Sequence, residues 1–140
     1  YEAREGQEPA LEAEAPITLN ADRELLWRTF ENLLRNALLH AGGAAPVRVR
    51  AGTTDRGQWV EVRVLDRGPG VPPERLAHLF DPFYRVQEAR DRETGGHGLG
   101  LAIAAAAVRR HGGTIEARNR AGGGLEMLVK LPIGGPPGAD

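Results

Sequence analysis

Apolar side chains recur at helical spacing along two long segments of the chain. In the first they fall between residues 22 and 41, where Asn20 or Asp22 can cap a helix that runs to about His40. The second segment, Leu99–His111, is an alanine-rich helix that Gly112 should stop. A shorter helix is predicted for Pro73–Phe80. The apolar positions of the first helix are Leu26, Phe30, Leu33, Leu34, Ala37, Leu38 and Ala41.

Alternation with a period of two predicts strands between these helices. Valines alternate with charged residues over Val47–Ala51 and Val60–Val64, and the turn residues within Thr53–Gln58 make the pair a hairpin. Two closing strands, Thr114–Asn119 and Leu125–Leu131, flank the turn AGGG. A fifth strand is predicted at Pro16–Leu19.

The order of these elements predicts an α+β fold. Strands in antiparallel pairs, with helices inserted between them, favour a two-layer α/β sandwich in which helices cover one face of the sheet. A length of 140 residues suits one compact domain with its own core. We expect residues 1–15 to lead into the domain from a segment that precedes the chain, residues 16–133 to form the domain, and residues 134–140 to be a disordered tail.

Composition excludes several kinds of chemistry. The chain has no cysteine, which removes thiol catalysis, disulfides and zinc–cysteine sites. A formal net charge of −1 argues against a nucleic-acid binder. Lys130 is the only lysine, so neither a Walker phosphate loop nor the lysine-dependent site of a protein kinase can be built. A nucleotide would have to be held by arginines, backbone amides and amide side chains.

Polar residues on the first predicted helix lie beside its apolar stripe. Asn32, Asn36 and His40 follow one another at one-turn intervals. Asparagine is a poor residue in the middle of a helix, because its amide competes for backbone hydrogen bonds. A solvated helix flank is the simple interpretation, and for Asn32 it stays open beside a functional one. For Asn36 we favour function, because its amide oxygen is a ligand of the kind that Mg²⁺ accepts alongside water and phosphate oxygens.

A turn after the second hairpin strand carries a candidate base-recognition group. By strand parity, Asp66 shares the face of Val60, Val62 and Val64, so its carboxylate points toward the covered side and needs a donor. The turn glycines Gly68 and Gly70 can adopt positive φ and let a flat ligand approach. An acidic turn of this kind is common. Its carboxylate could nevertheless accept a hydrogen bond from the exocyclic amine of adenine, whereas the carbonyl of guanine would repel it.

The segment around the second helix start offers an anion site. Arg85 stands where a charged loop, Val86–His97, begins, and its forked donors suit a terminal phosphate. In GGHGLGLAI the spacing and the preceding polar residues exclude a dinucleotide-binding loop. Free amides at Gly98, Leu99, Gly100 and Leu101 could still bind an anion at the positive end of the helix.

Four segments together resemble a known family. They are similar to the N, G1, F and G2 boxes of the ATP-binding (HATPase_c, Bergerat-fold) domain of sensor histidine kinases. In chain order, the four segments are ENLLRNA, DRGPGVP, DPFYR and GGHGLGLAI. Gyrase, Hsp90-type chaperones and MutL-type proteins share that fold. The resemblance covers Pro16–Pro132, and FYRVQEARDRETGGHGLGLAI looks closest to the Cpx-type envelope-stress sensors.

The resemblance implies a mixed, mostly antiparallel sheet of about five strands covered on one face by three helices. It also implies ATP and Mg²⁺ as ligands, with Asn36 holding the metal and Asp66 recognising the adenine amine. Asn36 and Arg85 would be the catalytic residues. The nucleotide-binding residues would be Asn32, Asn36, His40, Asp66, Gly68, Gly70, Val71, Tyr84, Arg85, Gly96, His97, Gly98, Leu99, Gly100 and Leu101.

Two departures from the family pattern bear on mechanism. The family's basic residue in the N box is replaced by Leu38 and Leu39, and His40 is the candidate substitute. ATP-hydrolysing relatives carry a glutamate four residues before the metal-binding asparagine, where this chain has Asn32. The missing base favours phosphoryl transfer over hydrolysis.

The implied function is that of a protein-histidine kinase in a two-component system. The acceptor histidine would lie on a separate helical dimerisation domain, and a response regulator would receive the phosphate. We expect the isolated domain to be monomeric, to lack autophosphorylation, and to be the cytoplasmic portion of an inner-membrane-anchored sensor kinase. The alternatives are a nucleotide-sensing module without transfer activity, an ATPase clamp of the gyrase, Hsp90 or MutL type, and a plain interaction domain.

Overall fold

One five-stranded sheet organises the molecule. The computed structural model describes residues 10–13, 16–40, 47–82 and 99–135. The strand order is β1-β2-β3-β5-β4, in which β1 pairs in parallel with β2 and the other neighbours are antiparallel. The elements are β1 (Ala10–Ala13), α1 (Arg23–His40), β2 (Arg48–Thr54), β3 (Trp59–Leu65), α2 (Pro73–Leu76), α4 (Gly100–Arg110), β4 (Thr114–Asn119) and β5 (Leu125–Pro132).

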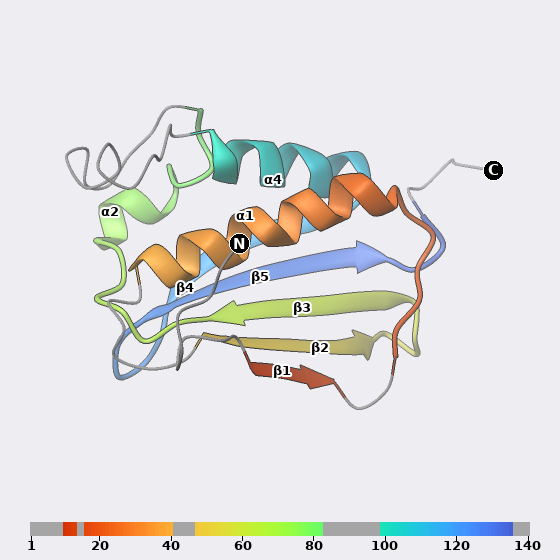
Figure 1. The fold of residues 1–140 in the computed structure, drawn as a ribbon, viewed down its shortest axis with the longest axis horizontal. Helices are drawn as coiled ribbons and strands as arrows, with labels where there is room; N and C mark the ends of the chain where they lie inside the picture. The colour runs from red at the N-terminus through yellow and green to blue at the C-terminus, as the bar shows by residue number, and fades with distance from the viewer. Residues whose placement is uncertain (1–9, 14–15, 41–46, 83–98, 136–140) are drawn as a thin grey trace.

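Two long helices cover one face of this sheet. Figure 1 shows α1 and α4 side by side and running in opposite directions over the strands, with short α2 toward the end where α1 ends and α4 begins. The predicted α+β sandwich with a mixed, mostly antiparallel sheet is therefore confirmed. The two hairpins and both long helices also lie where the sequence pattern placed them, to within a few residues at their ends.

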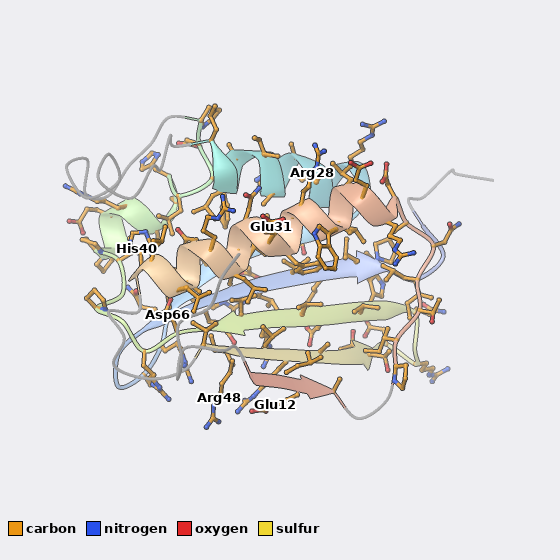
Figure 2. All side chains as sticks on the ribbon, viewed as in Figure 1. Glu12, Arg28, Glu31, His40, Arg48 and Asp66 are labelled. Atoms are coloured by element: carbon orange, nitrogen blue, oxygen red, sulfur yellow. The ribbon has the colours of Figure 1, made fainter. Side chains whose placement is uncertain are left out.

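The predicted strand at Pro16–Leu19 is wrong, because residues 16–20 adopt no regular structure. The strand that completes the sheet is β1, within the segment that was expected to precede the domain. Its sequence, ALEA, lacks an apolar alternation, and Leu11 is 72% exposed. Glu12 instead forms ion pairs with Arg48 and Arg50 of β2, near the edge of the sheet (Figure 2). An edge strand held by backbone pairing leaves little trace in a hydrophobic pattern.

The core lies between the two helices and the sheet. Leu26, Leu33 and Ala37 of α1 are buried against small side chains of α4, such as Ala104 and Ala105. Small residues on one helix allow its partner to approach closely, so the two helices pack as a pair rather than separately. Val64, Met127 and Val129 supply the central part of the sheet's covered face. This packing fixes where the ends of α1 and α4 lie relative to the strand ends.

His111 joins the end of α4 to the start of α1. Its Nδ1 donates to the carbonyl oxygen of Ala107 at 2.7 Å, so its Nε2 accepts the backbone N–H of Asp22 at 3.0 Å. The Asp22 side chain in turn accepts the N–H of Leu25 at 3.0 Å, which identifies Asp22 as the cap of α1. The imidazole is 7% exposed, its bond to Ala107 is buried, and its bond from Asp22 is partly buried.

Replacing His111 by alanine is expected to lower the free energy of unfolding by about 1–3 kcal/mol, because the part-buried N–H of Asp22 loses its acceptor and the buried imidazole that joins the two helices is removed. Thermal or urea unfolding followed by circular dichroism measures the change. Arg110→Ala, at the exposed neighbouring position, is the control and should change stability by less than about 0.5 kcal/mol. Equal stability of His111→Ala and the natural chain would contradict a joining role for the imidazole.

Within the described residues, no helix has the length and apolar character needed to cross a membrane.

Candidate functional site

Asp66 is a buried carboxylate at the point where β3 ends. It is 3% exposed, in agreement with the strand-parity prediction that its side chain points to the covered side. Its Oδ1 accepts two backbone N–H groups, from Gly68 at 2.9 Å and from Leu125 at 3.1 Å. Among the described residues the hydrogen bonds to this carboxylate all go to Oδ1, and Oδ2 is not one of their fully buried unpartnered atoms. One oxygen therefore fixes the side chain, and the other is available as an acceptor.

The turn that follows Asp66 is fixed at both of its ends. Gly70 has a φ of 75°, which glycine adopts without strain, whereas Gly68 is not among the described glycines with positive φ. Val71 is half-buried and packs against the core, so the far end of the turn is anchored as well. Gly70 thus adopts the positive φ that the sequence allowed, whereas Gly68, which donates its N–H to the Asp66 carboxylate, does not.

The polar residues of α1 lie at the margin of the core. Asn32, Asn36 and His40 are each half-buried, on the flank of a stripe in which Leu33 and Ala37 are buried. This placement confirms the helical-wheel expectation. Figure 2 shows His40, the last residue of α1, at the same end of the molecule as Asp66.

The start of α4 lies against this polar flank. A Cβ atom built on Gly100 would lie 3.6 Å from Oδ1 of Asn32, so these two residues, far apart in sequence, are neighbours. Leu99 occupies the cap position and has no side-chain hydrogen bond to the helix, and the first turn carries no acidic residue. The first N–H groups of α4, including those of Gly100 and Leu101, have no carbonyl partner within the helix. They provide a partial positive charge beside Asn32.

Five predicted site residues lie outside the described residues. These are Tyr84, Arg85, Gly96, His97 and Gly98. The described members come from three elements that meet at one end of the fold: the second half of α1, the turn after β3, and the start of α4.

Sequence reasoning missed the contribution of the β4–β5 turn. Leu125, at the start of β5, donates to Asp66, while Asn119 at the end of β4 and Arg120 in the turn bond to the backbone of the Asp66–Val71 turn. Partial burial lowers the pKa of Arg120, and the nearby Arg67 guanidinium lowers it further, while the attraction of Asp66 acts in the opposite direction. The signal in the sequence was an unusual turn, NRAGGG, with more glycine than a hairpin needs.

The described side chains could hold a metal ion only together with a bound molecule that supplies further oxygen ligands. Among the described residues, no group of three histidine, aspartate or glutamate side chains could hold an ion. The Asn36 amide oxygen is a hard ligand, and Mg²⁺ commonly takes one or two protein oxygens and completes its shell with phosphate oxygens and water. The residues present therefore fit Mg²⁺ brought by a nucleotide.

Comparisons with known proteins agree with this geometry. Residues 21–135 match the family model described as "Histidine kinase-, DNA gyrase B-, and HSP90-like ATPase". The chain is 39% identical over 118 residues to the sensor histidine kinase CpxA of Escherichia coli (strain K12), a match that spans 84% of the chain and 25% of CpxA. The chain thus spans about a quarter of the length of this curated relative.

Solved structures give the same result. The mycobacterial sensor histidine kinase MprB is 30% identical, with a TM-score of 0.78, over 96% of this chain and 87% of that one. Full-length ShkA, solved in complex with AMPPNP, is 32% identical with a TM-score of 0.76 over 93% of this chain and 26% of its own.

The chain therefore belongs to the histidine kinase, DNA gyrase B and HSP90-like ATPase family. Within that family it is homologous to the ATP-binding catalytic domain of sensor histidine kinases. The resemblance to Cpx-type sensors is consistent with the match to CpxA.

Proposed function

We propose that this domain binds Mg·ATP at the end of the fold where α1 ends and α4 begins, and donates the γ-phosphate to a histidine on a separate helical dimerisation domain. A response regulator would then take the phosphate from that histidine. In this arrangement the domain is the cytoplasmic catalytic part of a membrane-anchored sensor. AMPPNP, bound by the ShkA relative, is an ATP analogue, which supports this ligand class.

The observation that carries the proposal is the state of the Asp66 carboxylate. Two backbone donors hold Oδ1, and among the described residues none of the hydrogen bonds to this carboxylate goes to Oδ2. The adenine 6-amino group is a donor of the right kind for that oxygen, while the 6-carbonyl of guanine or hypoxanthine is not. The positive φ of Gly70 lets the turn pack against the Asn119 side chain, which helps to fix the backbone that follows Asp66.

The phosphate end of the ligand would lie between α1 and α4. The first N–H groups of α4 suit an anion, and Asn36 would contribute its amide oxygen to Mg²⁺ held by the phosphates. When bound, the metal would neutralise the charge that develops on the phosphate oxygens. His40 would stand in for the family's basic N-box residue, with Asn32 nearby. Arg85, with Tyr84, Gly96, His97 and Gly98, would supply the lid that closes over the triphosphate.

Transfer rather than hydrolysis follows from the chemistry at Asn32. An amide cannot accept a proton from water as a carboxylate does, and Asn32 occupies the place of that carboxylate beside the start of α4. The acceptor imidazole nitrogen would form a bond to the γ-phosphorus as the bond to the β-phosphate oxygen breaks and ADP leaves. A group on the partner domain would take the imidazole proton, so this chain contributes position and charge stabilisation.

The experiment mixes the chain with its histidine-bearing helical domain and ATP labelled on the γ-phosphate. We expect acid-labile phosphohistidine on the helical domain, which requires both proteins, and negligible phosphate release by the chain alone. Steady phosphate release without phosphohistidine would support an ATPase clamp instead. Nucleotide binding without either product would support a sensing module, and no nucleotide binding would leave only an interaction domain.

A further inference from the structure

The turn between β4 and β5 is bonded to the Asp66–Val71 turn along its whole length. At one end, the Asp66 N–H donates to the carbonyl oxygen of Leu125 at 3.0 Å, and the Leu125 N–H returns to the Asp66 carboxylate. At the other end, Val71 is bonded to Asn119. None of these β4–β5 residues belongs to the four segments that carry the family resemblance, yet they contact the group that would recognise the base.

The Asn119 side-chain amide bonds to both the N–H and the carbonyl oxygen of Val71, as the backbone of a neighbouring strand would. Its Oδ1 accepts the Val71 N–H at 2.8 Å, and its Nδ2 donates to the Val71 carbonyl oxygen at 2.6 Å. Only a side-chain amide offers an acceptor and a donor at this spacing, because a carboxylate has no donor and a hydroxyl is too short. The contact is close: a Cβ on Gly70 would lie 2.7 Å from Oδ1 of Asn119.

Two arginines, one on each turn, donate hydrogen bonds to the backbone of the other turn. Arg120 of the β4–β5 turn donates to the carbonyl oxygen of Asp66 at 2.8 Å. Arg67 of the Asp66 turn donates to the carbonyl oxygens of Ala121 and Gly123, both at 3.1 Å. Each guanidinium thus satisfies carbonyl groups of the other turn, although the two cations repel each other. Despite this repulsion, the hydrogen bonds from the two guanidinium groups tie the Asp66 backbone to the β4–β5 turn.

The glycine before Leu125 allows the two turns to approach. Gly124 has a φ of 104°, and a Cβ built on it would overlap the carbonyl oxygen of Asp66. Backbone therefore packs directly on backbone at the base of the Asp66 side chain, and a movement of one turn must move the other.

We infer that Asn119 and Arg120 are positioning residues for base recognition: they hold the Asp66–Val71 turn so that Oδ2 of Asp66 meets the 6-amino group of adenine. This inference rests on the proposed function, because it concerns the same nucleotide. It adds that selectivity for adenine over a 6-carbonyl purine is set in part by the β4–β5 turn.

The test compares ATP with inosine triphosphate, which has a carbonyl in place of the 6-amino group, in calorimetric titrations of the full chain. Asn119→Asp keeps the side-chain volume and replaces the donor that bonds to the Val71 carbonyl by a repelling oxygen. We expect this variant and Arg120→Ala each to bind ATP about tenfold more weakly, since each loses a hydrogen bond that fixes the turn. Affinity for inosine triphosphate should be nearly unchanged, so the preference for ATP should shrink by a similar factor.

Arg118→Ala is the matched control, because this exposed arginine of β4 pairs with Glu116 and not with the Asp66 turn. It should keep the full preference for ATP. Arg120→Lys, which keeps the charge and a donor, should recover part of it. A purely structural role would instead lower the melting temperature and weaken both nucleotides equally.

The outcomes separate the inference from the proposed function. If the natural chain binds ATP no better than inosine triphosphate, the proposed base recognition fails. If the natural chain discriminates and both variants discriminate equally well, only the positioning role is overturned. If Asn119→Asp does not fold, Asn119→Ser is used instead. Its hydroxyl can still accept a hydrogen bond but is too short to donate to the Val71 carbonyl, and the ratio of its affinities for ATP and inosine triphosphate decides the question.

Discussion

Asp66→Asn is expected to weaken ATP binding by about 100-fold while the fold persists. The asparagine carbonyl can replace Oδ1 and accept the N–H groups of Gly68 and Leu125, so the backbone contacts survive. The amide nitrogen then replaces Oδ2 and presents hydrogens to the hydrogens of the adenine amine. Losing a hydrogen bond to a charged group and leaving buried donors opposed costs about 1.5–3 kcal/mol, which corresponds to the predicted change in affinity.

Calorimetric titration with Mg·ATP measures this effect, and circular dichroism reports the fold. Inosine triphosphate supplies the internal control: its 6-carbonyl can accept from the new amide, so its affinity should rise relative to that of ATP. An exposed carboxylate, Glu74→Gln, changes the net charge equally and should leave ATP affinity unchanged. Affinity of Asp66→Asn within a factor of two of the natural chain would remove Asp66 from the site.

Asn36→Ala is expected to abolish the dependence of ATP binding on Mg²⁺ and to lower the rate of phosphoryl transfer by about 100-fold. If Asn36 is a metal ligand as proposed, its loss would reduce charge stabilisation at the transferring phosphate, an effect of about 2.7–4 kcal/mol for comparable groups. Alanine is a better helix former than asparagine, so α1 should not weaken. The Mg²⁺ dependence of the calorimetric affinity and the rate of phosphohistidine formation measure the two effects.

The neighbouring residue provides the control for this variant. Arg35 is exposed, and among the described residues it pairs only with Glu31 on the same helix, at 3.1 Å, so Arg35→Ala should keep both the Mg²⁺ dependence and the transfer rate. If Asn36→Ala still bound ATP more tightly with Mg²⁺ than without it, another group would hold the metal.

Local patterns predicted the parts of the fold that local forces decide. The apolar stripe of α1, the alternating valines of β2 and β3, and the burial of Asp66 all follow from periodicity within a short window of sequence. Strand β1 does not, because backbone pairing with β2 and ion pairs with Arg48 and Arg50 hold an otherwise exposed segment. Such contacts depend on which distant strand pairs with the segment, and a short stretch of sequence does not contain that information.

Some residues of the candidate site could likewise be predicted from the local sequence, and others could not. Asn36 and Asp66 stood out because each is costly in its local setting: one is an amide in a helix, and the other is a carboxylate at a buried strand end. Asn119 and Arg120 are ordinary residues for a turn, and only the approach of the β4–β5 hairpin to the Asp66 turn gives them a role. The proximity of Gly100 to Asn32 was likewise invisible, because it arises from the packing of α1 against α4.

The most direct measurement of the central claim is a nuclear magnetic resonance titration of the labelled chain with Mg·AMPPNP. If the nucleotide lies at the end of the fold described here, the amide signals of Gly68, Gly70 and Leu125 should shift together with those of Gly100 and Leu101 at the start of α4. The exposed strand residues Glu12 and Glu116 should be unaffected. Saturable shifts confined to the face of the sheet that bears these two glutamates, or no shifts at all, would contradict the assignment of this domain as an ATP-binding phosphoryl donor.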